Sequence, residues 1–440
     1  MEKCADFTVI FKVLGFSIKR FRTKAAYRHL QEEYKNLQER HERIQENNMN
    51  SLNHMQEEIR KIYENNKNSQ MTFDEFISDY FLDRQCELVK NDKYPECIER
   101  ELARLKDVSG YFVDDLRHNY LSILLELPEP TPQPRDFFNG DEEVYIRWEI
   151  ERNVEKRNKI SKEAHRKNRR VIIVGDSFLR SFTTFSDHQV PDEYRKGISF
   201  TLDDVTSYFD ATRSSRLEQM LNDKELVITD EQKSRARSCI DKIVNSHLTK
   251  YNHQPIFVPK IGREGVSKVL VVDQSYGDMS VIKGMANEKT FVDMLQSAIN
   301  ENPDADIIVK THPDTMTGRK GGYYTALVPH DNVYAMTEPI NPISLIEYSD
   351  KVYVCSSQFG FEALMCGKEV HVFGIPFYAG WGLTTDKQKC VRRDNVRSLE
   401  EVFYLAYIAY SRYVNPQTKS QCEIEEAMDY LLELRNKFCL

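Results

Sequence analysis

The 440-residue sequence contains no apolar run long enough to cross a membrane, no CxxC pair and no excess of basic residues. The first absence leaves no candidate for a transmembrane helix, which needs about 20 apolar residues. The formal net charge of −8 argues against bulk nucleic-acid binding, which requires a basic surface. The nine cysteines are not spaced like metal ligands, so we expect most to be reduced core residues of a cytosolic protein, among them Cys239, Cys355 and Cys366.

Hydrophobic residues make up 40% of the sequence and charged residues 30%, which is typical of a soluble protein with a core. The length is sufficient for two or three domains. The segment 7–24 is apolar at its start and basic at its end, the reverse of a signal peptide. Two interpretations stay open: an amphipathic helix in peripheral contact with an anionic membrane, or a helix packed on the rest of the protein.

Residues 23–70 are polar and almost free of Gly and Pro, with apolar or aromatic residues spaced alternately by three and four. That spacing, interrupted once, predicts a coiled-coil helix over 27–62 and, through it, a homo-oligomer. An intramolecular helical hairpin is the alternative. Helical patterns continue to about residue 127, where four prolines between Pro128 and Pro134 predict an extended linker.

From Arg170 onward, short runs rich in β-branched residues alternate with helical patterns, as in the buried parallel strands of a doubly wound sheet. The expected strands are 171–174, 269–272, 307–310, 351–355 and 370–373. We therefore predict an α/β protein of the GT-B-like class, in which two Rossmann-like halves face a cleft, preceded by an α-helical, coiled-coil N-terminal region. The expected domains are 1–127 (helical), 128–140 (linker), 141–262 (first half, for the acceptor, opening with a charged helix at 141–168) and 263–440 (second half, for the donor, closed by C-terminal helices).

Polar clusters follow four of the expected strands, at the carboxyl ends where open α/β sheets bind ligands. They are Gly175–Ser181, Asp273–Ser280, Thr311–Pro313 and Ser356–Gln358. The last cluster opens a predicted helix, whose free N–H groups and neighbouring hydroxyls suit a phosphate. This arrangement favours a binding site for an anion between the two halves.

Individual side chains in these clusters have defined chemical uses. His312 can donate to a phosphate oxygen, and Lys310 adds positive charge if its side chain reaches the same side. Asp278, in a glycine-containing loop, can act as a nucleophile or base, and Arg180 can pair with a carboxylate. Each alone has a structural explanation, such as a helix cap. The functional interpretation depends on all four clusters lying at the strand ends of one sheet system.

The chain from about 171 to 435 resembles the capsule-polysaccharide β-Kdo transferases of the KpsC/WbbB type, over about three-fifths of its length. The matching strings, in order, are Phe178–Ser181, Tyr208–Thr212, Ser215–Glu218, Lys250–Asn252, Val271–Gln274 with Gly277–Ser280, Lys310–Asp314, Gly318–Tyr323, Ser357–Leu364, Phe373–Thr384 and Tyr407–Pro416. The resemblance does not extend to residues 1–140.

The resemblance implies CMP-β-Kdo as donor, a bacterial surface glycan or lipid-linked glycan as acceptor, and retention of the β configuration. It implies that Asp278 attacks the anomeric carbon to form a covalent aspartyl-Kdo intermediate, as carboxylates of retaining glycosidases do. A leaving group with one phosphate requires no metal, and no other cofactor is expected. The enzyme would act in the cytoplasm, with peripheral contact to the inner face of the inner membrane.

Site residues are carried over from the matching motifs. His312 and Ser356 or Ser357 would bind CMP. Other residues of the same motifs are assigned to donor binding, namely Gln274, Ser280, Lys310, Gln358 and Glu362. Arg180 and Ser181 are assigned to the substrate carboxylate or the acceptor, and Asp176 joins Asp278 as a catalytic candidate.

One departure concerns the string before Phe178, where the family usually reads Glu-Asp-Gly and this chain has Gly175-Asp176-Ser177. Three consequences stay open: Asp176 takes over from the glutamate, the acceptor differs, or the enzyme is impaired. Two other functions also stay open, transfer of another CMP-activated, sialic-acid-like sugar and a non-catalytic scaffold for capsule assembly. A metal-dependent GT-A enzyme is set aside, because Asp304-Ala-Asp306 precedes its strand instead of following it.

Overall fold

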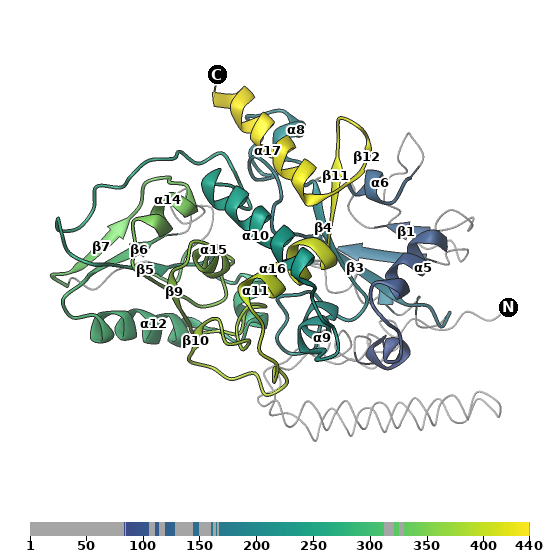
Figure 1. Cartoon of the computed structure of the whole chain (residues 1–440), viewed down its shortest axis with the longest axis horizontal. Coiled ribbons are helices and arrows are strands. Elements are labelled where there is room, and N and C mark those ends of the chain that lie inside the picture. The colour runs from purple at the N-terminus through teal and green to yellow at the C-terminus, as the bar shows by residue number, and fades with distance from the viewer. Residues whose placement is uncertain are drawn as a thin grey trace, which may run out of the picture. The chain divides into compact units, whose positions relative to one another are not determined.

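The computed structural model describes residues 83, 85–104, 111–113, 119–127, 144–148, 160–161, 164, 167–311, 321–324 and 330–439 (Figure 1). The chain divides into two compact units. The second, Val89–Ile150 with Arg169–Leu440, contains both sheets and nearly all of the described residues. The predicted membrane-contact segment 7–24, coiled coil 27–62 and linker 128–140 lie outside the described residues.

The first sheet has six strands in the order β1 (Tyr111–Val113), β2 (Val144–Trp148), β3 (Val171–Asp176), β4 (Ser199–Asp203), β11 (Ser411–Asn415) and β12 (Ser420–Cys422). The first three pair in parallel, whereas β4 is antiparallel to both β3 and β11, and β12 is antiparallel to β11. The sheet is therefore mixed, which differs from the parallel half expected from the sequence. Two features produce the difference: β4 runs antiparallel to β3, and the C-terminal tail returns to this sheet as β11 and β12 and covers the free edge of β4.

Two strands before Arg170 also differ from the expectation of helices. In β2, the string Val-Tyr-Ile-Arg-Trp lies inside the segment expected as a charged helix, and its first four residues are buried. β-Branched and aromatic residues favour a strand when a neighbouring strand is available, and β3 provides it. Since β1 pairs with β2, residues on both sides of the expected linker 128–140 contribute to one sheet.

The second sheet is parallel throughout, in the order β10 (Thr385–Asp386), β9 (Glu369–Val372), β8 (Lys351–Val354), β5 (Lys268–Val272), β6 (Asp306–Lys310) and β7 (Val333–Met336). The strands predicted at 269–272, 307–310, 351–355 and 370–373 are confirmed to within about one residue. From β5 the chain adds β6 and β7 on one side and β8 and β9 on the other. The order therefore reverses between β5 and β8, which makes this pair the switch point of the sheet.

Helices connect the strands and cover the sheets (Figure 1). Capping boxes begin three of them, at Thr229, Asn287 and Ser398. In the second half, α12 packs on one face of the sheet, and α15 packs on β8, β9 and α14. The helices of this unit are α5 (Glu96–Arg104), α6 (Leu121–Leu124), α8 (Asp192–Arg195), α9 (Arg216–Asn222), α10 (Asp230–Asn245), α11 (Met279–Lys283), α12 (Glu288–Glu301), α14 (Pro342–Glu347), α15 (Phe359–Met365), α16 (Leu399–Phe403), a π-helical segment η1 (Tyr404–Tyr410) and α17 (Ile424–Cys439).

The two halves share one hydrophobic core cluster, which includes side chains from both sheets. At its centre, the ring of Phe178, which follows β3, stacks on Tyr407 with ring centroids 4.4 Å apart and contacts Phe377 at 4.8 Å. Buried aromatic pairs of this kind stabilise beyond their buried area. The core therefore holds the loop after β3 against the second half.

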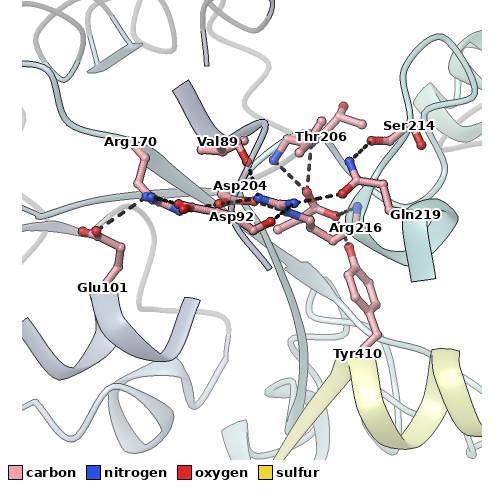
Figure 2. Close-up of polar contacts among 12 residues, drawn as sticks. Val89, Asp92, Glu101, Arg170, Asp204, Thr206, Ser214, Arg216, Gln219 and Tyr410 are labelled. Atoms are coloured by element: carbon pink, nitrogen blue, oxygen red, sulfur yellow. Dashed lines mark hydrogen bonds and ion pairs between the residues drawn. The ribbon is translucent and has the colours of Figure 1, made fainter. Parts of the chain in front are cut away.

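A buried ionic network ties the residues around α5 to the first sheet (Figure 2). Asp204 is fully buried and pairs with Arg170 at 2.7 Å and with Arg216 at 2.6 Å. The Arg216 guanidinium also donates to the carbonyl oxygens of Asp92 at 3.0 Å and Val89 at 3.2 Å. The segment from Val89 to α5 is thus attached to the first sheet by charge-assisted hydrogen bonds.

Two expectations from composition can be compared with the structure. The seven cysteines whose side chains the structure describes are free thiols. Cys239 and Cys355 are buried, which confirms their predicted place in the core, whereas Cys366 is only half-buried. Within the described part of the chain, no helix combines the length and the apolar character that crossing a membrane requires.

Candidate functional site

The switch point between β5 and β8 brings two of the predicted clusters together. Residues Asp273–Ser280 leave the carboxyl end of β5, and residues Ser356–Gln358 leave the carboxyl end of β8. The two strands are hydrogen-bonded neighbours in parallel register. Their carboxyl ends therefore lie at the same edge of the sheet, the position at which open α/β sheets bind ligands.

The buried side chain of Gln274 bridges these two clusters. Its Oε1 accepts a hydrogen bond from the Ser356 backbone N–H at 3.0 Å, and its Nε2 donates to Ser356 Oγ at 3.2 Å. The same Nε2 lies 3.4 Å from Ser280 Oγ. One amide thus fixes the loop after β5, the serine after β8 and the start of α11 in a single arrangement.

Asp278 lies in the loop that Gln274 holds. It is the N-cap of α11, and its Oδ1 accepts a hydrogen bond from Ser280 N at 3.0 Å. The residue is half-buried, and Gly277 before it has φ +73°, a left-handed turn that favours glycine. The structural role considered for Asp278, a helix cap, is therefore present. The cap also fixes the direction of the carboxylate.

A second loop supports the Asp278 loop from the side of α12. Tyr276 N donates to Gly321 O at 2.7 Å, and the hydroxyl of Tyr323 accepts from Gly277 N at 3.4 Å. Asp273, whose carboxyl pKa is raised by burial, accepts from Tyr323 N at 3.0 Å. The Gly-Gly-Tyr string of the sequence motif thus positions the loop that carries Asp278.

Two glycines allow a close approach that sequence reasoning did not single out. A Cβ on Gly284 would lie 2.3 Å from the Ser280 carbonyl oxygen and 2.9 Å from Ser356 Cβ. A Cβ on Gly374 would lie 2.8 Å from the Gly284 carbonyl oxygen. Ile375 N donates to that same oxygen at 2.7 Å. In the sequence, Gly374 belongs to a string that matches the transferase family, Phe373-Gly-Ile-Pro, but the string itself does not indicate a close contact.

Gln358 connects this site to the first half. Its Nε2 donates to the Phe178 carbonyl at 2.9 Å and lies 3.4 Å from Glu362 Oε1. Ser357, next to it, accepts from Phe359 N through its hydroxyl at 3.2 Å. The loop after β3 and the start of α15 are therefore in direct contact, as expected for a site shared by the two halves.

Glu362 is almost fully buried beside Gln358, and burial raises the pKa of its carboxyl to about 7, although the Lys250 backbone N–H and the Lys250 charge oppose the shift. A buried carboxyl with a raised pKa in a candidate site is typical of a group retained for function. It costs stability at pH values where it ionises, because burial disfavours the charged form.

We expect Glu362→Gln to stabilise the protein at pH 8 by about 2–3 kcal/mol and to change little at pH 5. The pKa of Glu362 is higher in the folded protein than in the unfolded chain. The stability that its protonated carboxyl contributes is therefore fully present at low pH and is lost as the pH rises through about 7. Gln is close in shape to the protonated carboxyl. Urea unfolding of both proteins at pH 5 and pH 8 measures the effect, and a Gln variant less stable than wild type at pH 8 would contradict it.

The remaining predicted donor residues are Lys310 and His312. Lys310 ends β6 and is buried, and its Nζ donates to the Glu338 carbonyl at 3.1 Å. His312, two residues later, lies outside the described residues. In the part of the chain that the structure describes, no group of three His, Cys, Asp or Glu side chains is placed to hold a metal ion.

Asp176 and Arg180 form an ion pair at the end of β3, with Asp176 Oδ2 and Arg180 Nε 2.8 Å apart. The guanidinium is buried and also donates to Ser181 Oγ and to the Arg195 carbonyl, both at 2.8 Å. Ser181 Oγ in turn donates to the Thr183 carbonyl at 2.7 Å. Arg180 and Ser181 are therefore engaged in contacts within the first half, whereas the Asp176 side chain keeps 19% of its surface exposed.

Comparisons with known proteins identify a family and similar structures. A sequence model of the family described as capsule polysaccharide biosynthesis protein matches residues 262–415. The solved structure of a Thermosulfurimonas dismutans protein, KpsC, a β-Kdo 2,4 transferase, is 34% identical, with a TM-score of 0.65 over 73% of this chain and 98% of that chain. This likeness extends over both halves.

Two curated relatives are longer proteins. The capsule polysaccharide modification protein LipA of Neisseria meningitidis serogroup A is 42% identical over 275 residues, 60% of this chain and 38% of that protein. The lipopolysaccharide-processing protein LpsZ of Rhizobium meliloti is 36% identical over 258 residues, 58% of this chain and 57% of that protein. This chain thus spans less than two-thirds of the length of either relative.

Proposed function

This chain belongs to the capsule polysaccharide β-Kdo transferase family, and on that basis we propose that it transfers Kdo from CMP-β-Kdo to a bacterial surface glycan or glycolipid, with retention of configuration. The observation that supports the proposal best is the bridge from Gln274 to Ser356 and Ser280. This bridge places the Asp278 loop beside the serines after β8, at the switch point of a GT-B-like fold. In the proposal, Asp278 is the nucleophile and the serines bind the donor phosphate, the two groups that transfer from a nucleotide sugar requires.

In the proposed mechanism, a carboxylate oxygen of Asp278 forms a bond to the anomeric carbon of Kdo. The bond from that carbon to the phosphate oxygen breaks, and CMP leaves with the electron pair. An acceptor hydroxyl then displaces the Asp278 ester, losing its proton to a base, and the carboxylate is regenerated. Two inversions at one carbon give net retention.

The other residues have supporting roles in the proposal. Ser356, Ser357 and His312 would donate to the CMP phosphate, and Lys310 would add positive charge. Asp176 is proposed as the base that takes the acceptor proton, because it ends β3, two residues before Phe178, whose carbonyl Gln358 connects to the donor half. Arg180 would act through Asp176, whose carboxylate it orients.

The test is to incubate the full chain with CMP-Kdo, formed in situ because it decays, and to record intact mass and CMP release. We expect a covalent mass gain of one Kdo residue and release of one CMP per adduct. Tight CMP binding without an adduct would favour a sialic-acid-like donor, and screening other CMP-sugars would follow. Absence of CMP binding would favour the scaffold alternative.

A further inference from the structure

A buried carboxylate of the first half, that of Glu218 on α9, holds two arginines of the second half. Its Oε1 pairs with Arg392 Nε at 2.8 Å, and its Oε2 pairs with Arg393 Nε at 3.0 Å. The Arg393 side chain is buried as well, so salt screens this pair much less than a surface pair. The two halves are therefore connected by an ionic contact in addition to the core that they share.

Arg393 connects this carboxylate to the backbone around Tyr378. Its Nη1 donates to the carbonyl oxygens of Pro376 at 2.5 Å and of Ala379 at 2.7 Å. Tyr378 lies between these two residues in the sequence. Because a guanidinium is a rigid, planar fork of donors, Arg393 fixes both carbonyls relative to Glu218.

The Tyr378 side chain connects the same segment to the serine motif after β8. Its hydroxyl donates to the Ser357 carbonyl oxygen at 2.6 Å. The phenol group lies directly on the backbone of α15, since a Cβ on Gly360 would be 2.2 Å from the hydroxyl oxygen and 2.8 Å from Cζ. Tyr378 is fully buried. It therefore supports Ser357 from inside the protein and has no part of its own in the proposed chemistry.

Resting on the proposed function, in which Ser357 donates to the donor phosphate, we infer that Glu218 is a positioning residue for the donor site. It acts through Arg393 and Tyr378. The carbonyl that Tyr378 holds belongs to the peptide unit that follows Ser357, so its direction sets how the serine is presented. Hydrogen bonds weaken steeply with misalignment, so a small displacement of this unit lowers phosphate affinity. A carboxylate of the half assigned to the acceptor thus governs affinity for the donor.

The inference is tested with CMP and cytidine, which differ only in the phosphate. Isothermal titration calorimetry of the full chain measures both affinities, at a temperature below the melting point of every variant. Tyr378→Phe removes the hydroxyl and keeps the ring. It should weaken CMP binding by about fivefold, the size of one net hydrogen bond, and leave cytidine binding unchanged.

Glu218→Gln extends the test across the two halves. An amide has one acceptor oxygen, so it can serve only one of the two arginines and turns an N–H group toward the other. We expect CMP affinity to fall by roughly tenfold, again with no change for cytidine. The double variant with Tyr378→Phe should also be roughly tenfold weaker than wild type, because both substitutions break the same path.

Tyr413→Phe is the matched control for Tyr378→Phe. Tyr413 is buried, and its hydroxyl also donates to a backbone carbonyl, that of Tyr407, at 2.7 Å. It lies on β11 of the first sheet, so its loss should leave both affinities unchanged. Thermal melts of all variants check that they are folded.

Four results would overturn the inference. Wild-type CMP affinity in either Tyr378→Phe or Glu218→Gln would leave Glu218 as a structural contact between the halves. A double variant weakened by about fiftyfold would show two independent effects. Equal losses for CMP and cytidine would assign the effect to the nucleoside pocket. No CMP binding by the wild type would overturn the proposed donor as well, whereas the other three results leave the donor intact.

Discussion

Asp278→Asn should abolish transfer of Kdo, lowering the turnover rate by about 10⁴-fold or more, as loss of a catalytic nucleophile does in other enzymes. The neutral amide cannot form the glycosyl ester that the proposed double displacement requires. Intact mass after incubation with CMP-Kdo should show no Kdo adduct, and CMP release with acceptor present should approach the uncatalysed rate.

Asn is the sharper substitution at this position because Asn caps helices as well as Asp. Asp278→Ala would also lose the hydrogen bond from Ser280 N, which is worth about 1 kcal/mol. Its effect on activity would therefore combine the loss of the helix cap with the loss of the nucleophile. Asp176→Asn serves as the matched control. It should still form the Kdo adduct but slow the transfer from it, since its proposed role concerns only the acceptor. Turnover by Asp278→Asn within tenfold of wild type would exclude the aspartyl intermediate.

Asp204→Ala should destabilise the protein by about 3–5 kcal/mol, the usual cost of removing one partner of a buried ion pair. Asp204 has no exposed side-chain surface and is shared by Arg170 and Arg216 (Figure 2). Its removal leaves two largely buried guanidinium groups without their closest common carboxylate. Urea unfolding by circular dichroism measures the loss.

A matched surface pair provides the control for Asp204→Ala. Asp394 pairs with Lys224 at 3.0 Å, but its side chain is 67% exposed, so Asp394→Ala should leave the unfolding midpoint nearly unchanged. In Asp204→Ala the attachment of Val89 and Asp92 through Arg216 should also weaken, and limited proteolysis should cut sooner around α5. A loss below 1 kcal/mol would show that water or neighbouring groups compensate both arginines.

The strands of the second half could be predicted from the sequence because each is a short β-branched run buried on both faces. β5, β6, β8 and β9 all have this form, and their carboxyl ends indicated the positions of Lys310, which ends β6, and of the loops that carry Asp278 and Ser356. The first half was predicted less well. β2 lies in a charged segment, and β11 and β12 lie in a tail that we predicted to be helical. They become strands only through pairing: β2 with β3, β11 with β4, and β12 with β11.

The sequence by itself determined the α/β class, the strand-end location of the site and the identity of the candidate nucleophile, because these depend on local patterns and fixed motifs. The tertiary structure alone decided the contacts between residues far apart in the chain. Gln274 meets Ser356 across 82 positions, and Gln358 meets Phe178 across 180. The tertiary structure also decided burial. The sequence around Lys310 and Arg180 does not predict that both side chains are buried in the folded chain. Whether a charged side chain faces a ligand or a neighbouring carboxylate depends on which strands become neighbours, and that follows from packing of the whole chain.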